Sequence, residues 1–336
     1  MKAAFMDGPE HFVIRDVDVP VPGEKEVLIR VRACGICGSD LGLYKAGMED
    51  RILGHEFSGD IVEIGPGVSG WKPSDRVVAE PLLVCGECAW CKRGQFELCS
   101  SLGFTGLMED GAFAEYVKVP SRQLYRLPDE VSYLQGALVE PLSVSLHGVL
   151  NSIMRPGDAV AVSGCGIIGL FALLWARTLG AGRLIATEVA EARIAVAHKL
   201  ADVVLNPTQV NLMQEFERLT DDLGPRVIFE CSGNPTAQCE AIDLVQRGGQ
   251  VVLLGIGYDP VPINLMIVST KEVSIKGSVA YSSQNGMGEF PMTLQFLKDR
   301  RIDPEQVPLT TLSLEQIGAG FKAAKAGEYA KVIIMP

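Results

Sequence analysis

The densest group of reactive side chains is a run of four cysteines within fifteen positions, Cys85-x2-Cys88-x2-Cys91-x7-Cys99. Four thiolates at these spacings can surround one Zn²⁺ tetrahedrally at about 2.3 Å per bond, and the intervening loop residues let the backbone wrap the ion. A chance cluster of free thiols is the alternative. Because four protein ligands leave no open coordination position, the spacing predicts a structural zinc site.

A second motif, Gly164-x-Gly166-x-x-Gly169, follows an apolar strand and opens an apolar helix predicted over 167–179. The glycine spacing alone is weak, but in this context it is typical of dinucleotide-binding turns. The glycines permit the tight turn, the approach of pyrophosphate to the backbone, and close packing of helix on sheet. Unpaired N–H groups at the helix N-terminus then favour phosphate, so the motif predicts a dinucleotide site.

Glu188 ends the next predicted strand, nineteen residues after Gly169. A carboxylate at this distance hydrogen-bonds the ribose 2′-hydroxyl and repels a 2′-phosphate, so Glu188 favours NAD over NADP. Arg193 is near enough in sequence to cover the adenine or to meet a phosphate. A solvated acid at the strand end is the alternative for Glu188.

A third group is dispersed along the chain: Cys37, the pair His55-Glu56, and Glu140. A thiolate, an imidazole and one or two carboxylates could hold a second Zn²⁺ with one position open for water or substrate. On the residues alone, a structural role for His55-Glu56 and a redox pair of Cys34 with Cys37 stay open.

The elements that must position these groups change in character near residue 155. Before about Pro120, short β-type runs at 27–33, 60–67 and 75–78 are separated by turns, as in an all-β module. Beyond it, apolar strands alternate with helices, which predicts a parallel sheet covered on both faces. The predicted strands are 159–162, 183–187, 227–230 and 250–254, the helices 191–200, 236–246 and 290–298, and the final strand 330–334.

Length and composition exclude several classes of protein. The 336 residues suggest about two domains. A net charge of −11, with basic runs no longer than pairs, argues against a nucleic-acid binder. The N-terminus has an acid and a turn before any apolar run, which predicts a cytoplasmic protein whose nine cysteines are not disulfides. The uncharged stretch 159–176 approaches the length of a membrane span, but its serine and glycines indicate a strand, a turn and a helix.

Together these segments resemble the zinc-dependent medium-chain alcohol dehydrogenase family along essentially the whole chain. The resemblance is closest to the polyol branch, which includes sorbitol, butanediol, threonine and galactitol-1-phosphate dehydrogenases, because Glu140 stands where classical alcohol dehydrogenases use a cysteine. The matching segments are Cys37-Gly38-Ser39-Asp40, Gly54-His55-Glu56-x-x-Gly59 with Gly65, the four-cysteine lobe, Glu140-Pro141-Leu142 and the glycine motif.

The resemblance implies an α/β protein of two domains that assembles as a dimer or tetramer. A GroES-like catalytic domain at 1–150, completed by 285–336, would carry an inserted Rossmann NAD-binding domain at 151–284. The active cleft would lie where the two domains meet.

The resemblance also implies the chemistry. Cys37 and His55 would ligate the catalytic zinc, while Glu56 and Glu140 would ligate it or exchange with its water, in roles that the sequence leaves open. The metal would stabilise an alkoxide that passes hydride to NAD. Further residues would line the cofactor groove, with Ile168 on the nicotinamide side: Ile168, Gly255, Ile256, Ala280 and Tyr281.

The implied substrate is a secondary alcohol of a polyol, vicinal diol, amino alcohol or polyol phosphate. L-Threonine 3-dehydrogenase and a non-catalytic cofactor-binding relative are the alternatives. The chain departs from the family at two positions. Gly42 replaces a histidine that shuttles the proton from the retained Ser39, and Ala280 replaces the arginine of sorbitol dehydrogenases. We therefore expect a proton relay completed by water and no special preference for sorbitol.

Overall fold

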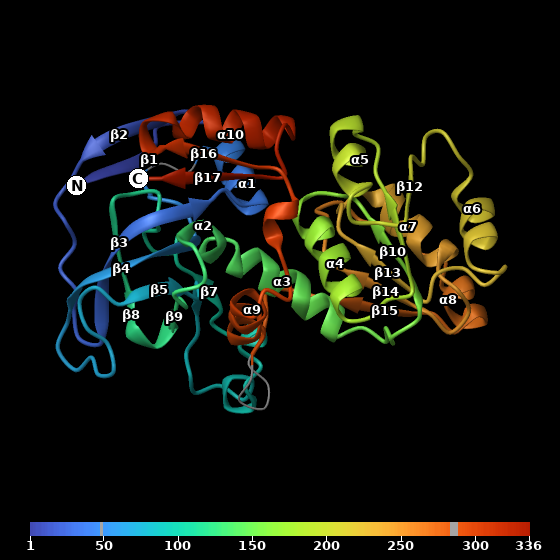
Figure 1. The fold of residues 1–336 in the computed structure, drawn as a ribbon, viewed down its shortest axis with the longest axis horizontal. Coiled ribbons are helices and arrows are strands. Elements are labelled where there is room, and N and C mark those ends of the chain that lie inside the picture. The colour runs from blue at the N-terminus through green and yellow to red at the C-terminus, as the bar shows by residue number, and fades with distance from the viewer. Residues whose placement is uncertain (48–49, 283–287) are drawn as a thin grey trace. The chain divides into compact units, whose positions relative to one another are not determined.

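The computed structural model describes residues 1–47, 50–282 and 288–336. It divides into two compact units, of which unit 1 comprises Met1–Glu140, Ser282–Arg300 and Pro308–Pro336, and unit 2 comprises Pro141–Tyr281 and Arg301–Val307. Unit 1 is built mainly of β-strands and unit 2 of strands alternating with helices (Figure 1). The predicted fold class is confirmed. The expected junction between residues 284 and 285 lies outside the described residues.

Unit 1 is organised around a seven-stranded sheet in the order β16-β17-β3-β4-β5-β9, with β8 also paired to β3. The long, apolar β3 pairs antiparallel with β4, β8 and the C-terminal strand β17. The strands are β1 (Lys2–Met6), β2 (Phe12–Asp16), β3 (Glu26–Gly35), β4 (Glu56–Ile64), β5 (Arg76–Ala79), β6 (Leu82–Leu83), β7 (Gly103–Phe104), β8 (Tyr116–Pro120), β9 (Leu124–Arg126), β16 (Leu309–Ser313) and β17 (Lys331–Met335).

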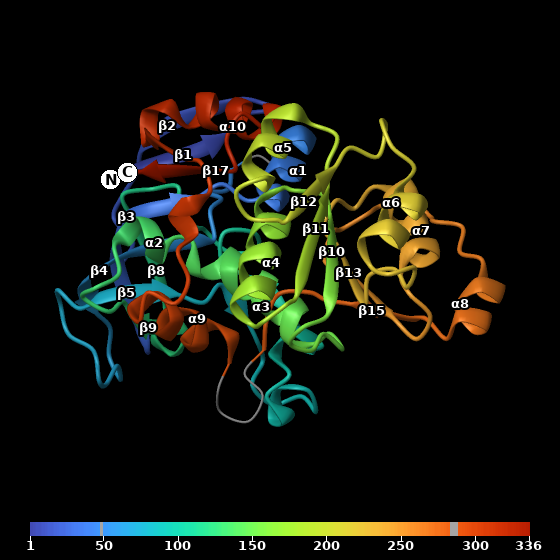
Figure 2. The same ribbon diagram turned by 45° about the vertical axis from the view of Figure 1, so that its right-hand side comes forward.

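An aromatic cluster fixes two helices of unit 1 to its core. The ring of Phe321 on α10 lies 4.8 Å from that of Tyr44 on α1 and 4.7 Å from that of Phe12, centroid to centroid. Helix α10 packs along β17, as Figure 2 also shows. The helices of this unit are α1 (Gly38–Ala46), α2 (Tyr133–Gly136), α9 (Glu289–Lys298) and α10 (Ile317–Ala326). The cluster thereby packs the last turn of α1 against α10 and β2.

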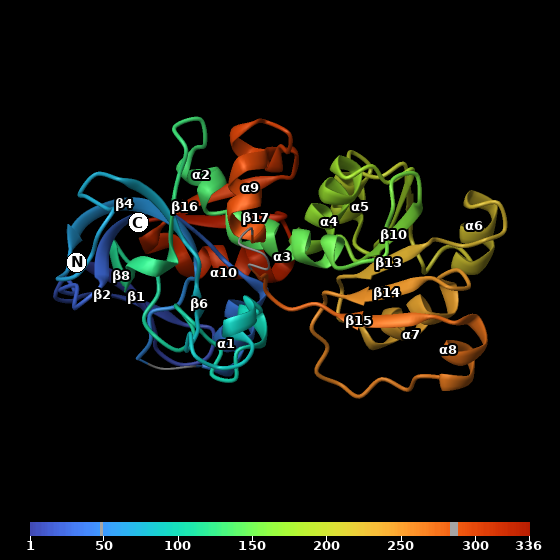
Figure 3. The ribbon, with the colours of Figure 1, turned by 90° about the horizontal axis from the view of Figure 1, so that it is seen from below.

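Unit 2 contains a six-stranded parallel sheet in the order β12-β11-β10-β13-β14-β15. The order reverses between β10 and β13, and ligands of such sheets bind beyond the carboxyl ends of the strands at that reversal. The strands are β10 (Ala159–Ser163), β11 (Arg183–Thr187), β12 (Val203–Leu205), β13 (Val227–Glu230), β14 (Gln250–Leu253) and β15 (Ser274–Gly277). Figure 3 shows β13, β14 and β15 side by side.

Helices cover both faces of this sheet, with α4 and α5 on one face and α6, α7 and α8 on the other (Figures 1 and 2). They are α3 (Val139–Leu150, from Pro141 onward in this unit), α4 (Ile167–Thr178), α5 (Glu191–Ala197), α6 (Leu212–Leu219), α7 (Pro235–Leu244) and α8 (Leu265–Lys271). Asparagine side chains accept from backbone N–H groups at the starts of α6, α7 and α8. These caps supply the local reason why each helix begins where it does.

The predicted strands and helices are found within a few residues of their expected bounds, with two differences. Strand β4 begins at Glu56, four residues before the expected start. Helix α1 lies inside the segment expected to be all β, because the Asp40 carboxylate accepts from the Cys37 N–H and starts a helix there. In the part of the chain that is described, no helix has the length and apolarity needed to span a bilayer. The uncharged stretch 159–176 forms β10, a turn and most of α4.

Candidate functional site

Cys37, His55 and Glu56 come together in unit 1. Their potential ligand atoms, one from each side chain, all lie within 4.8 Å of one another. Cys37 immediately precedes α1, His55 immediately precedes β4, and Glu56 is the first residue of that strand. Two segments eighteen positions apart thus bring a thiol, an imidazole and a carboxylate together.

Strand pairing and a helix cap produce this convergence. Gly35, the last residue of β3, pairs with Glu56, the first residue of β4. The C-terminal end of β3 therefore lies beside the start of β4. The Cys37 backbone N–H then donates to the Asp40 carboxylate at 2.8 Å, and this bond turns the chain into α1. The thiol is therefore held by backbone geometry beside His55.

Asp40 is fully buried, and its Oδ1 lies 3.5 Å from Nδ1 of His55. Burial alone would lower the pKa of His55, but Asp40 and Cys37 together raise that pKa well above its ordinary value. A carboxylate beside one ring nitrogen orients the imidazole and keeps its proton on that side, which leaves the other nitrogen as a ligand. This is the usual environment of a histidine that binds a metal.

Glu140 lies in the first turn of α3, with only 6% of its surface exposed. It does not belong to the group of three ligand atoms described above. Burial and the Glu56 carboxylate raise the pKa of Glu140 to about 7, against the opposing effects of His55 and Lys331. Because Glu56 and His55 both affect the pKa of Glu140, the three side chains share one buried environment.

The residues present fit a metal ion. The buried polar atoms of this group are paired mainly as ions: Asp40 Oδ1 faces His55 Nδ1 at 3.5 Å, and Glu56 Oε2 contacts the Lys331 ammonium. A thiol, an imidazole and a carboxylate whose ligand atoms all lie within 4.8 Å of one another are expected where a cation completes the bonding. One sulfur, one imidazole and carboxylate oxygens form a donor set that Zn²⁺ accepts.

Lys331 adds a positive charge to the same environment. Its Nζ donates to Glu56 Oε1 at 2.6 Å and also contacts Oε2, and both side chains are only 1% exposed. Burial by itself would lower the pKa of Lys331, but Glu56 and Cys37 raise it. Lys331 was not predicted, because nothing in the pattern of the final strand distinguishes it from a solvent-facing lysine.

The four cysteines of the lobe also gather around a single point, with all four sulfur atoms within 4.8 Å of one another. The Cys85 sulfur lies 3.9 Å from that of Cys91 and 3.6 Å from that of Cys99. A tetrahedron with bonds of about 2.3 Å has edges of about 3.8 Å, so these separations fit one Zn²⁺. Backbone N–H groups, chiefly that of Cys91, lower the pKa of the Cys88 thiol to about 6.

Each glycine of the motif in unit 2 has a different backbone environment. Gly164 has a φ of +89°, in the left-handed region that other residues avoid. A Cβ on Gly169 would lie 1.9 Å from the Gly164 carbonyl oxygen, so no side chain fits there. A Cβ on Gly166 would meet nothing within 4 Å. The turn is therefore open at Gly166, where a phosphate could approach, and closed at the other two positions.

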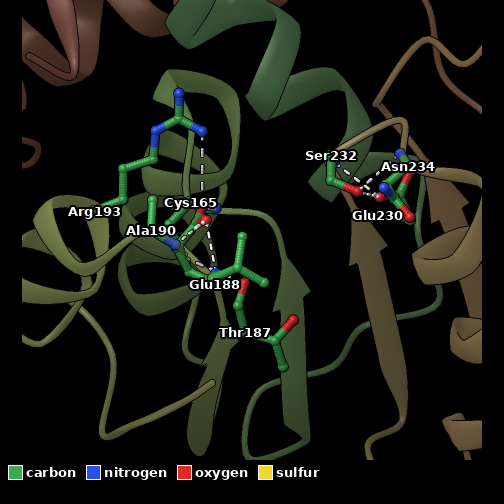
Figure 4. A network of polar contacts seen from close by, with 9 residues as sticks. Cys165, Thr187, Glu188, Ala190, Arg193, Glu230, Ser232 and Asn234 are labelled. Carbon is green, nitrogen blue, oxygen red and sulfur yellow. Dashed lines mark hydrogen bonds and ion pairs between the residues drawn. The ribbon is translucent and has the colours of Figure 1, made fainter. Parts of the chain in front are cut away.

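Glu188 lies in the turn after β11 and is 6% exposed. Its Oε2 accepts from the Cys165 N–H at 2.8 Å, and its Oε1 accepts from the N–H groups of Val189 and Ala190 at 2.8 and 3.0 Å. Nη1 of Arg193 is 4.0 Å from Oε2 (Figure 4). A carboxylate accepts about four hydrogen bonds, so Glu188 holds the loop together and keeps capacity for one ligand hydroxyl.

A second buried carboxylate, Glu230 at the end of β13, was not predicted. It is completely buried, and its Oε2 accepts from the Gly233 N–H at 3.2 Å while its Oε1 accepts from the Ser232 N–H at 2.8 Å (Figure 4). Strand β10 pairs with β11 on one side and β13 on the other, so the loops after β11 and β13 flank the glycine turn. The sequence signal that could have identified Glu230 is an acidic residue at the end of an otherwise apolar strand.

The other predicted cofactor residues lie in unit 2, mostly at the same edge of the sheet. The Gly255 N–H, after β14, donates to the Glu230 carbonyl at 2.8 Å. Ile256 is 70% exposed, Ile168 is half-buried in the first turn of α4, and Ala280 and Tyr281 are buried after β15. The strand order thus brings together segments that are more than a hundred residues apart in sequence.

The fold and these groups of side chains define a zinc- and nucleotide-dependent oxidoreductase, and comparisons with known proteins agree. The family model for the alcohol dehydrogenase GroES-like domain matches residues 23–129, and the model for zinc-binding dehydrogenases matches residues 168–299. The sorbitol dehydrogenase of Bacillus subtilis (strain 168) is 34% identical over all of this chain and 97% of its own length.

Solved structures are similarly close. The 2R,3R-butanediol dehydrogenase from Bacillus subtilis is 32% identical, with a TM-score of 0.92 over 100% of this chain and 99% of that one. A zinc-binding dehydrogenase from Sinorhizobium meliloti 1021, solved with NADP bound, is 29% identical, with the same TM-score and the same coverage. This chain belongs to the zinc-dependent medium-chain alcohol dehydrogenase family, and the resemblance seen in its sequence is confirmed.

Proposed function

We propose that this protein oxidises a secondary alcohol of a polyol, vicinal diol, amino alcohol or polyol phosphate, with NAD as hydride acceptor and two Zn²⁺ per chain. The observation that carries the proposal is the convergence of Cys37, His55 and Glu56, whose ligand atoms all lie within 4.8 Å of one another. The substrate class is supported by relatives that are named sorbitol dehydrogenase, D-xylulose reductase and butanediol dehydrogenase.

In this proposal Cys37 and His55 hold the catalytic metal, completed by Glu56 or Glu140, and the four-cysteine lobe holds the structural one. The catalytic domain is 1–150 with 285–336, and 151–284 is the NAD-binding domain. Zinc supplies Lewis-acid polarisation of the alcohol oxygen, and NAD supplies the hydride acceptor. Asp40 orients His55, so the imidazole does not have to reorganise when substrate binds.

The proton leaves through Ser39, which is half-buried in the first turn of α1. A Cβ added to Gly42, one turn further along the helix, would meet nothing within 4 Å. The space that a histidine side chain fills in relatives is therefore open to water. Hydride transfer that is unaffected across pH by Ser39→Ala would contradict this relay.

We further propose that Glu188 gives the preference for NAD. Its buried carboxylate has three backbone donors and one remaining acceptor position, and a 2′-phosphate there would meet its negative charge. Arg193 is the group that could accommodate NADP instead. Glu188→Ala is expected to reduce the ratio of kcat/KM for NAD to that for NADP, and an unchanged ratio would count against the ribose role.

The decisive experiment measures NAD and NADP reduction against sorbitol, xylitol, 2,3-butanediol, threonine and galactitol 1-phosphate, together with zinc content. Two zinc ions per chain and turnover of a polyol or diol would support the proposal. Turnover of threonine alone would favour L-threonine 3-dehydrogenase. One zinc per chain and no turnover would favour a non-catalytic relative. The variants Cys37→Ser and His55→Ala are expected to abolish activity without unfolding the protein.

We also propose a cytoplasmic homo-oligomer, either a dimer or a tetramer, that binds a small-molecule substrate and neither nucleic acid nor membrane. The acidic net charge supports the exclusion of nucleic acid. Light scattering after size-exclusion chromatography measures the oligomeric state directly.

A further inference from the structure

A buried serine of unit 2 joins helix α3 to the first turn of α4, within the glycine motif. The Ser145 hydroxyl lies 3.0 Å from the carbonyl oxygen of Ile168 and 3.0 Å from that of Pro141, so its single proton is shared between two acceptors. Ser145 is completely buried inside α3. Because alanine suits a buried helix interior better than serine does, the hydroxyl indicates a role beyond helix formation.

The first turn of α4 needs support that leaves its N–H groups free. Gly166, the N-cap residue, has no side chain that could accept from these groups. The first N–H groups of a helix lack partners inside the helix, and they are the groups that a phosphate would meet. A side chain that capped them would take the place of the ligand. The bond from Ser145 to a carbonyl of this turn holds the same backbone and leaves its N–H groups unoccupied.

The same face of α3 also approaches a second segment of the predicted cofactor groove. Gly148 follows Ser145 by three residues, so the two lie on one face of the helix. A Cβ on Gly148 would lie 2.7 Å from Cδ2 of Leu254, which directly precedes Gly255. Helix α3 therefore packs closely against two segments that sequence reasoning assigned to the cofactor, one by a hydrogen bond and one by a glycine contact.

We propose that Ser145 is a positioning residue of the dinucleotide site, which holds the first turn of α4 in its binding conformation before the cofactor arrives. The inference rests on the proposed function, because it requires the phosphates of NAD at the glycine turn. Ser145 acts through the Ile168 carbonyl and not through contact with the cofactor. A turn that is already fixed loses less conformational freedom when it binds, so the hydroxyl raises the affinity without adding a contact.

The test removes the hydroxyl by Ser145→Ala in the full-length, zinc-loaded protein. The Kd for NAD, measured by calorimetry, should rise about fivefold, the effect expected from the loss of one net hydrogen bond. The Tm should stay nearly unchanged, because both carbonyls keep the main-chain bonds of their helices. Hydrogen exchange of the peptide covering 164–172 should be faster than in the unmodified protein without NAD, and equal to it with saturating NAD.

The matched control is Trp175→Phe, which removes a different hydrogen bond between the same two helices. Nε1 of Trp175 donates to the Leu142 carbonyl at 2.9 Å, about two turns further along α4 than Ile168. Trp175 is completely buried, so this variant should lower the Tm. Its Kd for NAD should remain within about twofold of the unmodified value, because the bond to the first turn is intact.

A third variant, Gly166→Ala, tests the proposed cofactor site itself. If the unmodified protein does not bind NAD, or if Gly166→Ala leaves the Kd unchanged, the proposed site is wrong. If Gly166→Ala weakens binding and Ser145→Ala does not, only the role of Ser145 is overturned. Equal weakening by Ser145→Ala and Trp175→Phe, or exchange at 164–172 that stays faster with NAD bound, would also overturn that role, because either result indicates a general loss of structure.

Discussion

Glu80 follows β5 in unit 1, and its carboxylate does not belong to the proposed catalytic metal site. Its Oε2 accepts from the Tyr125 hydroxyl at 3.0 Å, and the Tyr125 ring lies 5.1 Å from that of Phe290. Burial raises the pKa of Glu80 from 4.5 to about 7, with a further contribution from Glu289 and opposing ones from Tyr125 and Arg122. The folded protein therefore binds a proton here more tightly than the unfolded chain does.

The sign of the pH effect follows from this difference. Between pH 4.5 and 7 the folded state holds more protons than the unfolded state, so the free energy of unfolding falls as the pH rises through this window. At about 1.4 kcal/mol for each pKa unit, the full loss is about 3 kcal/mol. Because the Glu80 side chain retains some exposure, we expect about 2 kcal/mol between pH 5 and pH 8.

Glu80→Gln removes the titration, keeps the shape and still offers Tyr125 an acceptor oxygen. We expect this variant to be more stable than the unmodified protein by about 2 kcal/mol at pH 8, and nearly equal to it at pH 5. Urea unfolding followed by circular dichroism at both pH values measures the difference. The matched control is Glu63→Gln, which removes an exposed carboxylate on β4. A Glu80→Gln effect that is the same at both pH values, or that resembles the control, would refute the reasoning.

Three further predictions concern the glycine turn, the cysteine lobe and the missed carboxylate. Gly169→Ala should lower the Tm and weaken NAD binding at least tenfold by calorimetry, because its Cβ would overlap a carbonyl oxygen, whereas Gly166→Ala should weaken NAD and leave the Tm unchanged. Cys91→Ser should remove one zinc per chain by elemental analysis and expose residues 85–99 to proteolysis, with the second zinc retained. Glu230→Gln should cost about 1–3 kcal/mol in urea unfolding, because its amide would face backbone N–H donors.

Much of the fold followed from local patterns. Branched, apolar runs such as 183–187 and 227–230 became β11 and β13 with the expected bounds, because fully buried parallel strands tolerate few polar residues. The helix after the glycine turn was equally clear. Helix α1 was missed because its start depends on a single contact, the Asp40 carboxylate on the Cys37 N–H. Its apolar residues make no strong helical stripe, so the pattern around it is dominated by the neighbouring strands.

By itself, the sequence determined the residue types and spacings that can bind metal and dinucleotide. The lobe of Cys85 to Cys99 and the turn at Gly164 are each formed by one short segment of the chain, so the residues that bind the ligand lie close together in sequence. The tertiary structure decided which distant residues share an environment. Strand pairing set Glu56 beside Gly35 and brought Lys331 from the last strand into the same buried space. Charges interact through space and not along the chain, so only the fold could reveal that Glu56 has a lysine partner.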